Sequence, residues 1–297
     1  MQDYFLFLMP APDVVEKIQN KTLFYQAAET YGLPVPRSFS ISSEEELSSV
    51  ISSLDFPCII KPVNKQEWWH KDFSNTVGPY RKAFRCENKE ELLGIYSKIS
   101  HINQTAIVQE SIEGNDSQHY SVNLYVDDFG IVKGYYIVRK MRMYPISAGR
   151  GCFFITVHDD KILEKAIEVK NKFSLKGLIN IQFKRDIRTN HLKLIEAESR
   201  LSVSNFLGPA SGMNLAVLYY NDFTGQEMSN VSRYKAGVRY ADFLRDIKAF
   251  FQYRKEGLLN FGDWFSSYRR GLVFNGYMLS DPRPALMDIW FVLKHHL

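Results

Sequence analysis

The fold is decided by NIQF at residues 180–183 and, beyond a polar turn, LIEAESR at residues 194–200. The two segments predict neighbouring strands of a β-hairpin, because each is short, apolar at alternate positions and separated by turn residues. Alternate side chains of a strand point to the same face of a sheet, so Glu196, Glu198 and Arg200 share one face. The second strand therefore presents two carboxylates and a guanidinium together.

Gln182 lies on the partner strand and could reach the face that carries Glu196 and Glu198. Oxygen ligands of this kind suit Mg²⁺, which keeps several waters and bridges to phosphates, with Mn²⁺ as an alternative. An arginine on the same face can stabilise phosphoryl charge as it develops. The competing interpretation is a solvated strand face of alternating charge, which is common in antiparallel sheets.

Two lysines elsewhere in the chain are candidate phosphate ligands. Lys61 ends a short apolar strand at residues 56–61 and precedes Pro62, so its ammonium emerges at the edge of a sheet. Lys21 follows Asn20 near the start of a helical pattern. Either residue alone is most simply a surface lysine, but two cations together can flank a polyphosphate.

The composition of the 297 residues is that of a globular protein, with 45% apolar and 24% charged residues. The net charge of +4 is mild and the basic residues are dispersed, which argues against a nucleic-acid partner. The three cysteines, Cys58, Cys86 and Cys152, are far apart, which disfavours disulfides and favours a cytoplasmic protein. The apolar run at residues 4–9 is too short to span a membrane. The histidines, His119 among them, lack metal-ligand spacing and are predicted to be surface or packing residues.

Hydrophobic periodicity and turn residues predict the order of the elements. Helices are expected at residues 14–31, 43–53, 88–100, 159–173 and 210–220, and strands at residues 37–41, 56–61, 106–110, 120–126, 131–139, 152–157, 177–185 and 191–197. A helical tail is expected after residue 239. The order lacks the regular alternation of a doubly wound parallel sheet, so we expect an α+β protein of two lobes with antiparallel sheets.

Taken in order, these segments resemble the ATP-grasp superfamily, and most closely its carbamoyl-phosphate-synthetase-like branch, which includes carboxylate–amine ligases. The segments that carry the resemblance lie at residues 21–36, 56–62, 108–114 and 177–212. The resemblance implies an ATP-grasp fold, in which two α+β lobes with antiparallel sheets enclose ATP. It also implies four parts, namely residues 1–19 as a linker or remnant of an N-terminal domain, 20–110 as the N-lobe, 111–228 as the C-lobe and 229–297 as a helical C-terminal extension.

The resemblance implies roles for individual residues by position. Lys21 and Lys61 match the two basic residues that contact the phosphates of ATP. Gln109 and Glu110 match the hinge that meets adenine, and Ile112 lines that pocket. The matching Mg²⁺ ligands are Gln182, Glu196 and Glu198. Arg200 matches the arginine near the transferred phosphate or acyl phosphate and, with Lys61, is expected to be catalytic.

The function implied by the resemblance is an ATP-dependent ligase. ATP would phosphorylate the carboxylate of one small molecule, and the amine of another would displace phosphate to give an amide. Two alternatives stay open: a degenerate ATP-binding module or partner subunit without turnover, and acyl-phosphate chemistry on bicarbonate or a small acid without amide formation.

The chain departs from the family pattern in three places. Glu198 stands where the family usually has Asn, and Ser199 replaces Pro. The loop after Lys61 is often glycine-rich, but here residues 64–71 read NKQEWWHK. The family's usual N-terminal α/β domain would end where this chain begins, so we expect a homodimer or a partner chain to supply that part.

Overall fold

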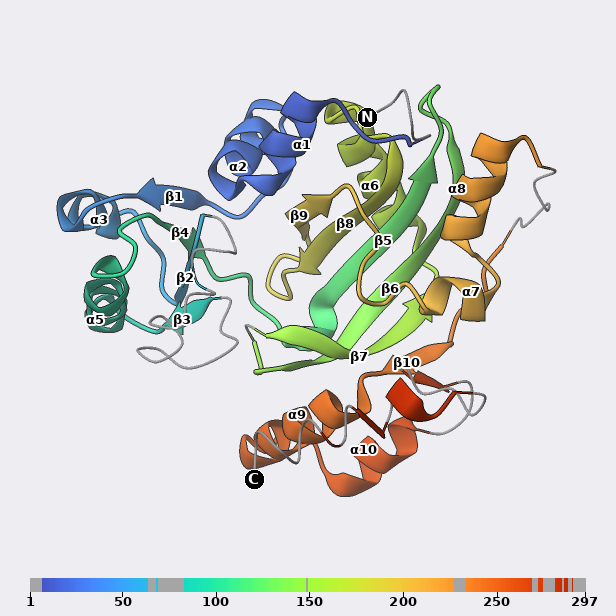
Figure 1. Ribbon diagram of the computed structural model, residues 1–297. Helices are drawn as coiled ribbons and strands as arrows, with labels where there is room; N and C mark the ends of the chain where they lie inside the picture. Colours follow the sequence, from blue (N-terminus) through green and yellow to red (C-terminus); the bar gives the residue numbers. More distant parts are fainter. Residues whose placement is uncertain are drawn as a thin grey trace.

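The computed structural model describes residues 7–63, 68, 83–147, 149–226, 233–268, 272–274, 281–284, 286–287 and 290. Within these residues the strands form two sheets, one of four strands and one of seven. Figure 1 shows the sheets in two lobes side by side, with the C-terminal helices below the larger lobe. All strand pairs are antiparallel except one short pair at the edge of the larger sheet, which confirms the predicted α+β class.

The small lobe is a four-stranded sheet with two helices on one side (Figure 1). Its strands, in spatial order, are β1 (Ser38–Ile41), β4 (Ala106–Glu110), β2 (Cys58–Lys61) and β3 (Phe84–Cys86), and its helices are α3 (Glu44–Ile51) and α5 (Lys89–Ser100). The side chains of Ser43 and Asn88 cap the two helices. Leu47 and Leu92 of the helices are fully buried in one cluster with Ile60 of β2. This core fixes the end of β2, where Lys61 lies.

The large lobe is a seven-stranded sheet in the order β11-β10-β7-β6-β5-β8-β9. These strands are β5 (His119–Val126), β6 (Val132–Tyr144), β7 (Arg150–Val157), β8 (Gly177–Arg185), β9 (Leu192–Glu198), β10 (Arg239–Ala241) and β11 (Leu272–Phe274). Helix α6 (Asp160–Lys172) buries Ile162, Ala166 and Val169 in the core with Ile181 of β8. The predicted hairpins at residues 120–139 and 177–197 are confirmed. The side chains of β8 that alternate with Ile181 lie on the other face of the sheet.

The N-terminal helical pattern is divided into two helices, α1 (Pro12–Gln19) and α2 (Lys21–Thr30). The sequence predicts one continuous helix here, and that prediction is wrong at Asn20. Asn20 has an extended backbone and its side chain accepts from the backbone N–H of Leu23, so it begins a new helix. Although α2 falls within the predicted N-lobe, its Phe24 stacks on Phe173 after α6, with ring centroids 5.5 Å apart. Helix α2 therefore packs on the large lobe.

A second predicted helix, at residues 210–220, is also divided in two. The structure has α7 (Leu207–Ser211) and α8 (Leu215–Thr224). Gly212 between them has a φ of 97°, a left-handed conformation that ends α7 and that residues other than glycine rarely adopt. The segment from β9 to α7 crosses the face of the large sheet, and Gly208 lies against the ring of Tyr136 on β6.

The C-terminal segment contains α9 (Phe243–Lys255) and α10 (Phe261–Ser267), as the predicted helical tail requires. It also contains β10 and β11, which the sequence does not predict, because strands of three residues carry no detectable alternation. Strand β10 pairs with β7, so this segment is continuous with the large sheet. Among the described residues no helix is long and apolar enough to cross a membrane. The cytoplasmic location stays a prediction.

Candidate active site

The hairpin of β8 and β9 brings the predicted metal ligands to one face of the large sheet. Gln182 pairs with Glu196 across the two strands, and Asn180 pairs with Glu198. The Gln182 side-chain amide donates to Glu196 Oε2 at 3.3 Å and to Asn180 Oδ1 at 3.0 Å. Two carboxylates and two amides therefore lie within one small area of the sheet.

Arg200 lies next to this area and is already paired. Its Nη2 donates to Glu198 Oε1 at 2.5 Å, and the Arg200 side chain is 59% exposed. The acid at position 198, where the family usually has Asn, thus neutralises the neighbouring guanidinium. The predicted catalytic arginine and the predicted third metal ligand are in direct contact.

On the small lobe, Lys61 is 8% exposed at the end of β2. Its Nζ donates to the Tyr25 hydroxyl at 2.8 Å and to Gln109 Oε1 at 2.9 Å, and the Gln109 amide donates in turn to Ser38 Oγ at 2.6 Å. The Tyr25 hydroxyl donates to the backbone carbonyl of Ile195 on β9 at 2.9 Å. A continuous line of hydrogen bonds therefore joins the small sheet to the strand that carries the predicted metal ligands.

Tyr25 is the bridge in this line, and the sequence did not identify it. Burial raises the pKa of Tyr25, and the negative charge of Glu196 raises it further, whereas the hydrogen bond with Gln109 lowers it. The phenol therefore stays protonated and can donate to Ile195 while it accepts from Lys61. The hydrogen bond to Ile195 places Tyr25 beside the strand that carries Glu196.

Lys21 lies at the same end of β2 as Lys61. Its Nζ donates to the carbonyl of Val63 at 3.4 Å. Of the loop that follows, Trp68 is buried and its ring lies 5.6 Å from that of Phe84, so this residue packs on the small lobe. Residues 64–67 and 69–71 of this loop lie outside the described residues.

The predicted hinge follows β4 and leads into the large lobe. Glu110 forms an ion pair with Lys193 of β9 at 3.1 Å. Ile112 is 4% exposed, and its carbonyl accepts from Lys184 Nζ at 2.6 Å. The side chain of Gln109 is held by Lys61. All three residues therefore line the junction between the two lobes.

Comparison with known proteins finds similar sequences and similar folds. The family described as ATP-grasp in the biosynthetic pathway with Ter operon matches residues 103–244. A D-aspartate ligase of Enterococcus faecium is 28% identical over 223 residues, which cover 73% of this chain and 52% of that protein. The solved structure of a biotin carboxylase–β-γ-ATP complex from Campylobacter jejuni matches with a TM-score of 0.62 at 16% identity, over 80% of this chain and 53% of that one. An L-amino acid ligase from Bacillus licheniformis matches with a TM-score of 0.54 at 16% identity, over 71% of this chain and 48% of that one.

Residues 103–244 are similar to this ATP-grasp family, and the solved structures confirm the predicted ATP-grasp fold. The chain spans about half the length of the D-aspartate ligase.

The donor set of this chain fits Mg²⁺ bound together with a nucleotide. Among the described residues no group of three His, Cys, Asp or Glu side chains is arranged to hold a metal by itself. Glu196 and Glu198 supply carboxylates and Gln182 an amide oxygen, and Mg²⁺ in nucleotide sites takes its other ligands from phosphates and water. The protein thus offers an incomplete shell of hard oxygen ligands, which a polyphosphate would complete.

A row of basic residues next to the acidic face was missed by the sequence prediction. His119 of β5 lies between Lys140 of β6 and Lys184 of β8, directly opposite both in the strand register. Lys184 is two residues beyond Gln182, so the alternation that identified Gln182 also signals Lys184. Burial lowers the pKa of both lysines. Burial, followed by the charges of Lys140 and then Lys184, holds the pKa of His119 well below its usual range. His119 is therefore a neutral imidazole inside a cationic row.

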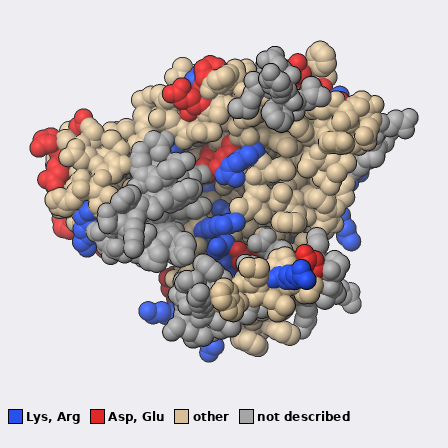
Figure 2. Space-filling model, in the orientation of Figure 1, with Lys and Arg blue, Asp and Glu red and all other residues tan. Residues whose placement is uncertain are grey.

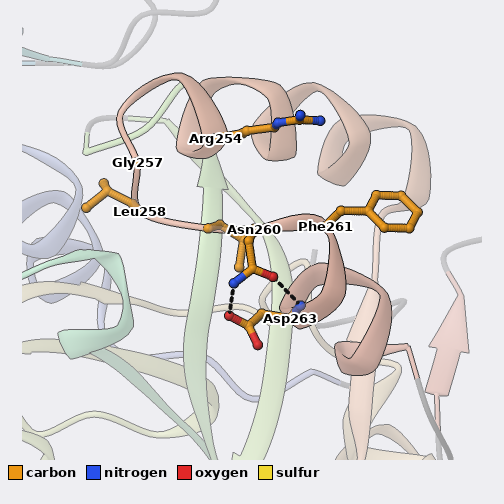
Figure 3. A pocket seen from close by; sticks show the side chains of 7 residues that line it. Arg254, Gly257, Leu258, Asn260, Phe261 and Asp263 are labelled. Carbon is orange, nitrogen blue, oxygen red and sulfur yellow. Dashed lines mark hydrogen bonds between the residues drawn. The ribbon is translucent and has the colours of Figure 1, made fainter.

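Figure 2 shows acidic and basic side chains gathered in the hollow between the two lobes, beside the large lobe. A different hollow, of about 460 Å³, lies at the loop between α9 and α10 (Figure 3). Its lining includes Arg254, Leu258 and Phe261, and Asn260 there is hydrogen-bonded to Asp263. None of the predicted site residues lines it, and no titratable cluster marks it as a reactive site.

Proposed function

We propose that this chain is an ATP-dependent carboxylate–amine ligase that binds Mg-ATP between its two lobes. The observation that carries the proposal is the line from Lys61 through Tyr25 to Ile195. It places a buried lysine of the small lobe across from the strand that carries Glu196 and Glu198. A cation on one side and oxygen ligands for a metal on the other are what a bound triphosphate requires.

In the proposed reaction a carboxylate oxygen of the acid attacks the γ-phosphorus of ATP, and ADP leaves. The amine nitrogen then attacks the acyl carbon, phosphate leaves, and the nitrogen loses a proton to give the amide. Mg²⁺, when bound at Gln182, Glu196 and Glu198, would neutralise phosphate charge. The side chains hold and align the reactants, because phosphoryl transfer needs little covalent chemistry from the protein.

Within this reaction each predicted residue has a defined task. Lys21 and Lys61 would neutralise phosphate oxygens from the small lobe, and the hinge at Gln109, Glu110 and Ile112 would border the adenine. Gln182, Glu196 and Glu198 would hold Mg²⁺. Arg200 would neutralise charge on the transferred phosphoryl group, after it exchanges its contact with Glu198 for a contact with the ligand. The names of two similar proteins, D-aspartate ligase and L-amino acid ligase, agree with amide-bond formation.

A direct test captures the activated acid. The protein is incubated with Mg-ATP, a panel of small acids and hydroxylamine, and both ADP and hydroxamate are measured. A ligase of this type forms hydroxamate and ADP in equal amounts with at least one acid. Release of ADP without hydroxamate for every acid would contradict the proposal.

The role of Lys61 is tested by ATP-dependent thermal stabilisation. Lys61→Ala is expected to abolish the rise in melting temperature that Mg-ATP gives the wild type, because a buried phosphate ligand is lost. Lys172→Ala is the matched control, since Lys172 is exposed at the end of α6. An unchanged thermal shift in Lys61→Ala would contradict the assigned role.

A second candidate function is nucleotide binding without turnover. The ion pair between Glu198 and Arg200 favours it, because it neutralises the catalytic arginine and places a second acid beside the phosphates. Tight ATP binding without ADP formation for any acid or amine would support this candidate. Assembly as a homodimer or with a partner chain stays a prediction of the family resemblance.

A further inference from the structure

Arg150 is a cation for which the described residues supply no acceptor. It begins β7, opposite Tyr144 of β6, and its side chain is exposed. Within the described part of the chain its side chain makes neither a hydrogen bond nor an ion pair, whereas its backbone pairs with Tyr144. The neighbouring basic side chains, by contrast, are already paired.

Arg245 is brought to the same place by the start of α9. The backbone N–H of Asp242 donates to the carbonyl of Cys152 at 2.8 Å, which continues the pairing of β10 with β7 toward Arg150. The Asp242 side chain caps α9 and accepts from Arg245 Nη1 at 2.5 Å. The first turn of α9 therefore lies beside the start of β7, with the Arg245 guanidinium held in place.

The segment after β9 approaches from the other side. The rings of Phe206 and Tyr240 stack with their centroids 6.4 Å apart, so this segment lies against β10. Tyr240 precedes the cap of α9 by two residues. Arg200 lies at the beginning of the same segment, paired with Glu198. The cluster of Arg150, Arg245 and Tyr240 thus adjoins the predicted catalytic arginine and the predicted metal ligands.

The charges of these groups act on one another. Partial burial lowers the pKa of Arg150, and the charges of Arg245 and, more weakly, Arg200 lower it further, against the opposing charge of Asp242. Burial raises the pKa of Tyr240 to about 12, with Asp242 raising it and Arg150 and Arg245 lowering it. These mutual effects agree with the contacts in placing the side chains close together. An anion bound there would remove the repulsion between the guanidinium groups.

We propose that Arg150 and Arg245 bind a substrate carboxylate other than the one that is phosphorylated, while Arg200 serves the reacting group. This proposal rests on the proposed ligase function. A guanidinium offers paired N–H donors that match the two oxygens of a carboxylate. The ligand class is therefore a small molecule with an additional carboxylate, either a dicarboxylic acid or an amine that carries its own carboxylate.

The position of the cluster separates this site from the nucleotide. The adenine hinge and Lys184 lie toward β8 and β4, whereas Arg150 begins β7, beyond β6. The match to the Ter-operon family ends at residue 244, so Arg245 and the rest of the C-terminal segment lie beyond that match. The C-terminal segment would thus contribute directly to substrate choice.

The test compares dicarboxylates with monocarboxylates of equal length, succinate with butyrate and so on from three to six carbons. Affinity is measured by calorimetry with Mg²⁺ and a non-hydrolysable ATP analogue, and KM is measured in the hydroxylamine assay. A second arm compares β-alanine with propylamine as the nucleophile. The arm that shows a preference for the additional carboxylate tells whether the acid or the amine carries that group.

Arg150→Gln is expected to weaken the preferred carboxylate ligand about tenfold or more, because a charge-assisted pair is lost, and to leave the KM for ATP unchanged. Arg150→Lys should weaken it less, and Arg254→Gln, an exposed arginine on α9, should have no effect. Melting temperatures confirm that each variant folds.

The proposal is overturned if neither arm shows a preference, if Arg150→Gln retains it, or if Arg150→Gln weakens only ATP or inorganic phosphate. Its failure is distinguishable from failure of the ligase function. If calorimetry shows the preference and its loss in Arg150→Gln, but no acid forms hydroxamate, the carboxylate site stands and the ligase proposal falls.

Discussion

Arg142 and Arg150 stand on either side of one bend, yet they have opposite environments. Arg142, near the end of β6, is 6% exposed, and its guanidinium donates twice to Asp246 of α9, at 2.7 Å each. Arg150, at the start of β7, is exposed, and its guanidinium makes no hydrogen bond within the described chain. The charge of Arg142 is neutralised inside the protein, and the charge of Arg150 is available to a ligand. Burial and pairing, and not residue type, separate a structural cation from a binding one.

Asp246 is the centre of the structural side of this comparison. It is fully buried and accepts, besides Arg142, from Trp264 Nε1 at 2.9 Å and the Tyr268 hydroxyl at 2.6 Å. Burial acts to lower the pKa of Arg142, but the hydrogen bonds and charge of Asp246 raise it overall. This one carboxylate therefore holds α9, α10 and β6 together.

The largest effect is expected from Asp246→Ala. It leaves the Arg142 charge buried without its partner and removes the acceptor of three further donors, on Trp264, Tyr268 and Cys152, so the free energy of unfolding should fall by about 3–5 kcal/mol. Urea unfolding followed by circular dichroism measures this change. A loss below about 1 kcal/mol would mean that the buried network is not what fixes the C-terminal segment.

A matched pair of substitutions sharpens the comparison. Arg142→Lys loses the two-pronged contact with Asp246 and should cost about 1–2 kcal/mol of stability without changing the KM for either substrate. Arg150→Lys should leave stability within about 0.5 kcal/mol and raise the KM of the carboxylate ligand. Urea unfolding and steady-state kinetics on both variants check the two expectations. The reverse pattern would exchange the roles assigned to the two arginines.

A smaller effect is expected from the cationic row around His119. Because its folded pKa lies below the ordinary value of about 6.5, the unfolded chain binds a proton first as the pH falls. The contribution of this group to stability is complete above about pH 6.5 and is lost progressively as the pH falls toward the folded pKa. His119→Gln should therefore flatten the fall in stability below pH 6.5, by up to about 1.4 kcal/mol per pH unit. The free energy of unfolding is measured across that pH range, with His191→Gln on an exposed turn as the control. If His119→Gln keeps the wild-type dependence of stability on pH, as the control should, the prediction is contradicted.

The sequence predicted the parts of the site that depend on local alternation. Gln182, Glu196 and Glu198 share a face because they belong to one hairpin, and a period of two suffices to find them. Lys184 follows from the same alternation but was overlooked. His119 and Lys140 could not be found in this way, because their place beside Lys184 depends on the register of three strands.

Other features depend on contacts between distant segments. In the sequence, Tyr25 is indistinguishable from other aromatic residues of an amphipathic helix. Its role depends on the contact with β9, which only the fold supplies. Asp246 reads as a surface acid, although α9 buries it completely. Arg142 and Arg150 were equivalent in the sequence, since both flank a glycine bend. Their difference arises only when α9 packs on the end of β6 and supplies one carboxylate to one of them.

The proposed ligase function requires that the face carrying Gln182, Glu196 and Glu198 holds a magnesium–nucleotide complex. Calorimetric titration of ATP, with and without Mg²⁺, into the wild type and Glu196→Ala tests this claim most directly. The wild type should bind ATP more tightly with Mg²⁺, and Glu196→Ala should lose that Mg²⁺-dependent gain while its melting temperature without ligand is retained. An equal Mg²⁺-dependent gain in both proteins would show that the metal and the nucleotide are bound elsewhere.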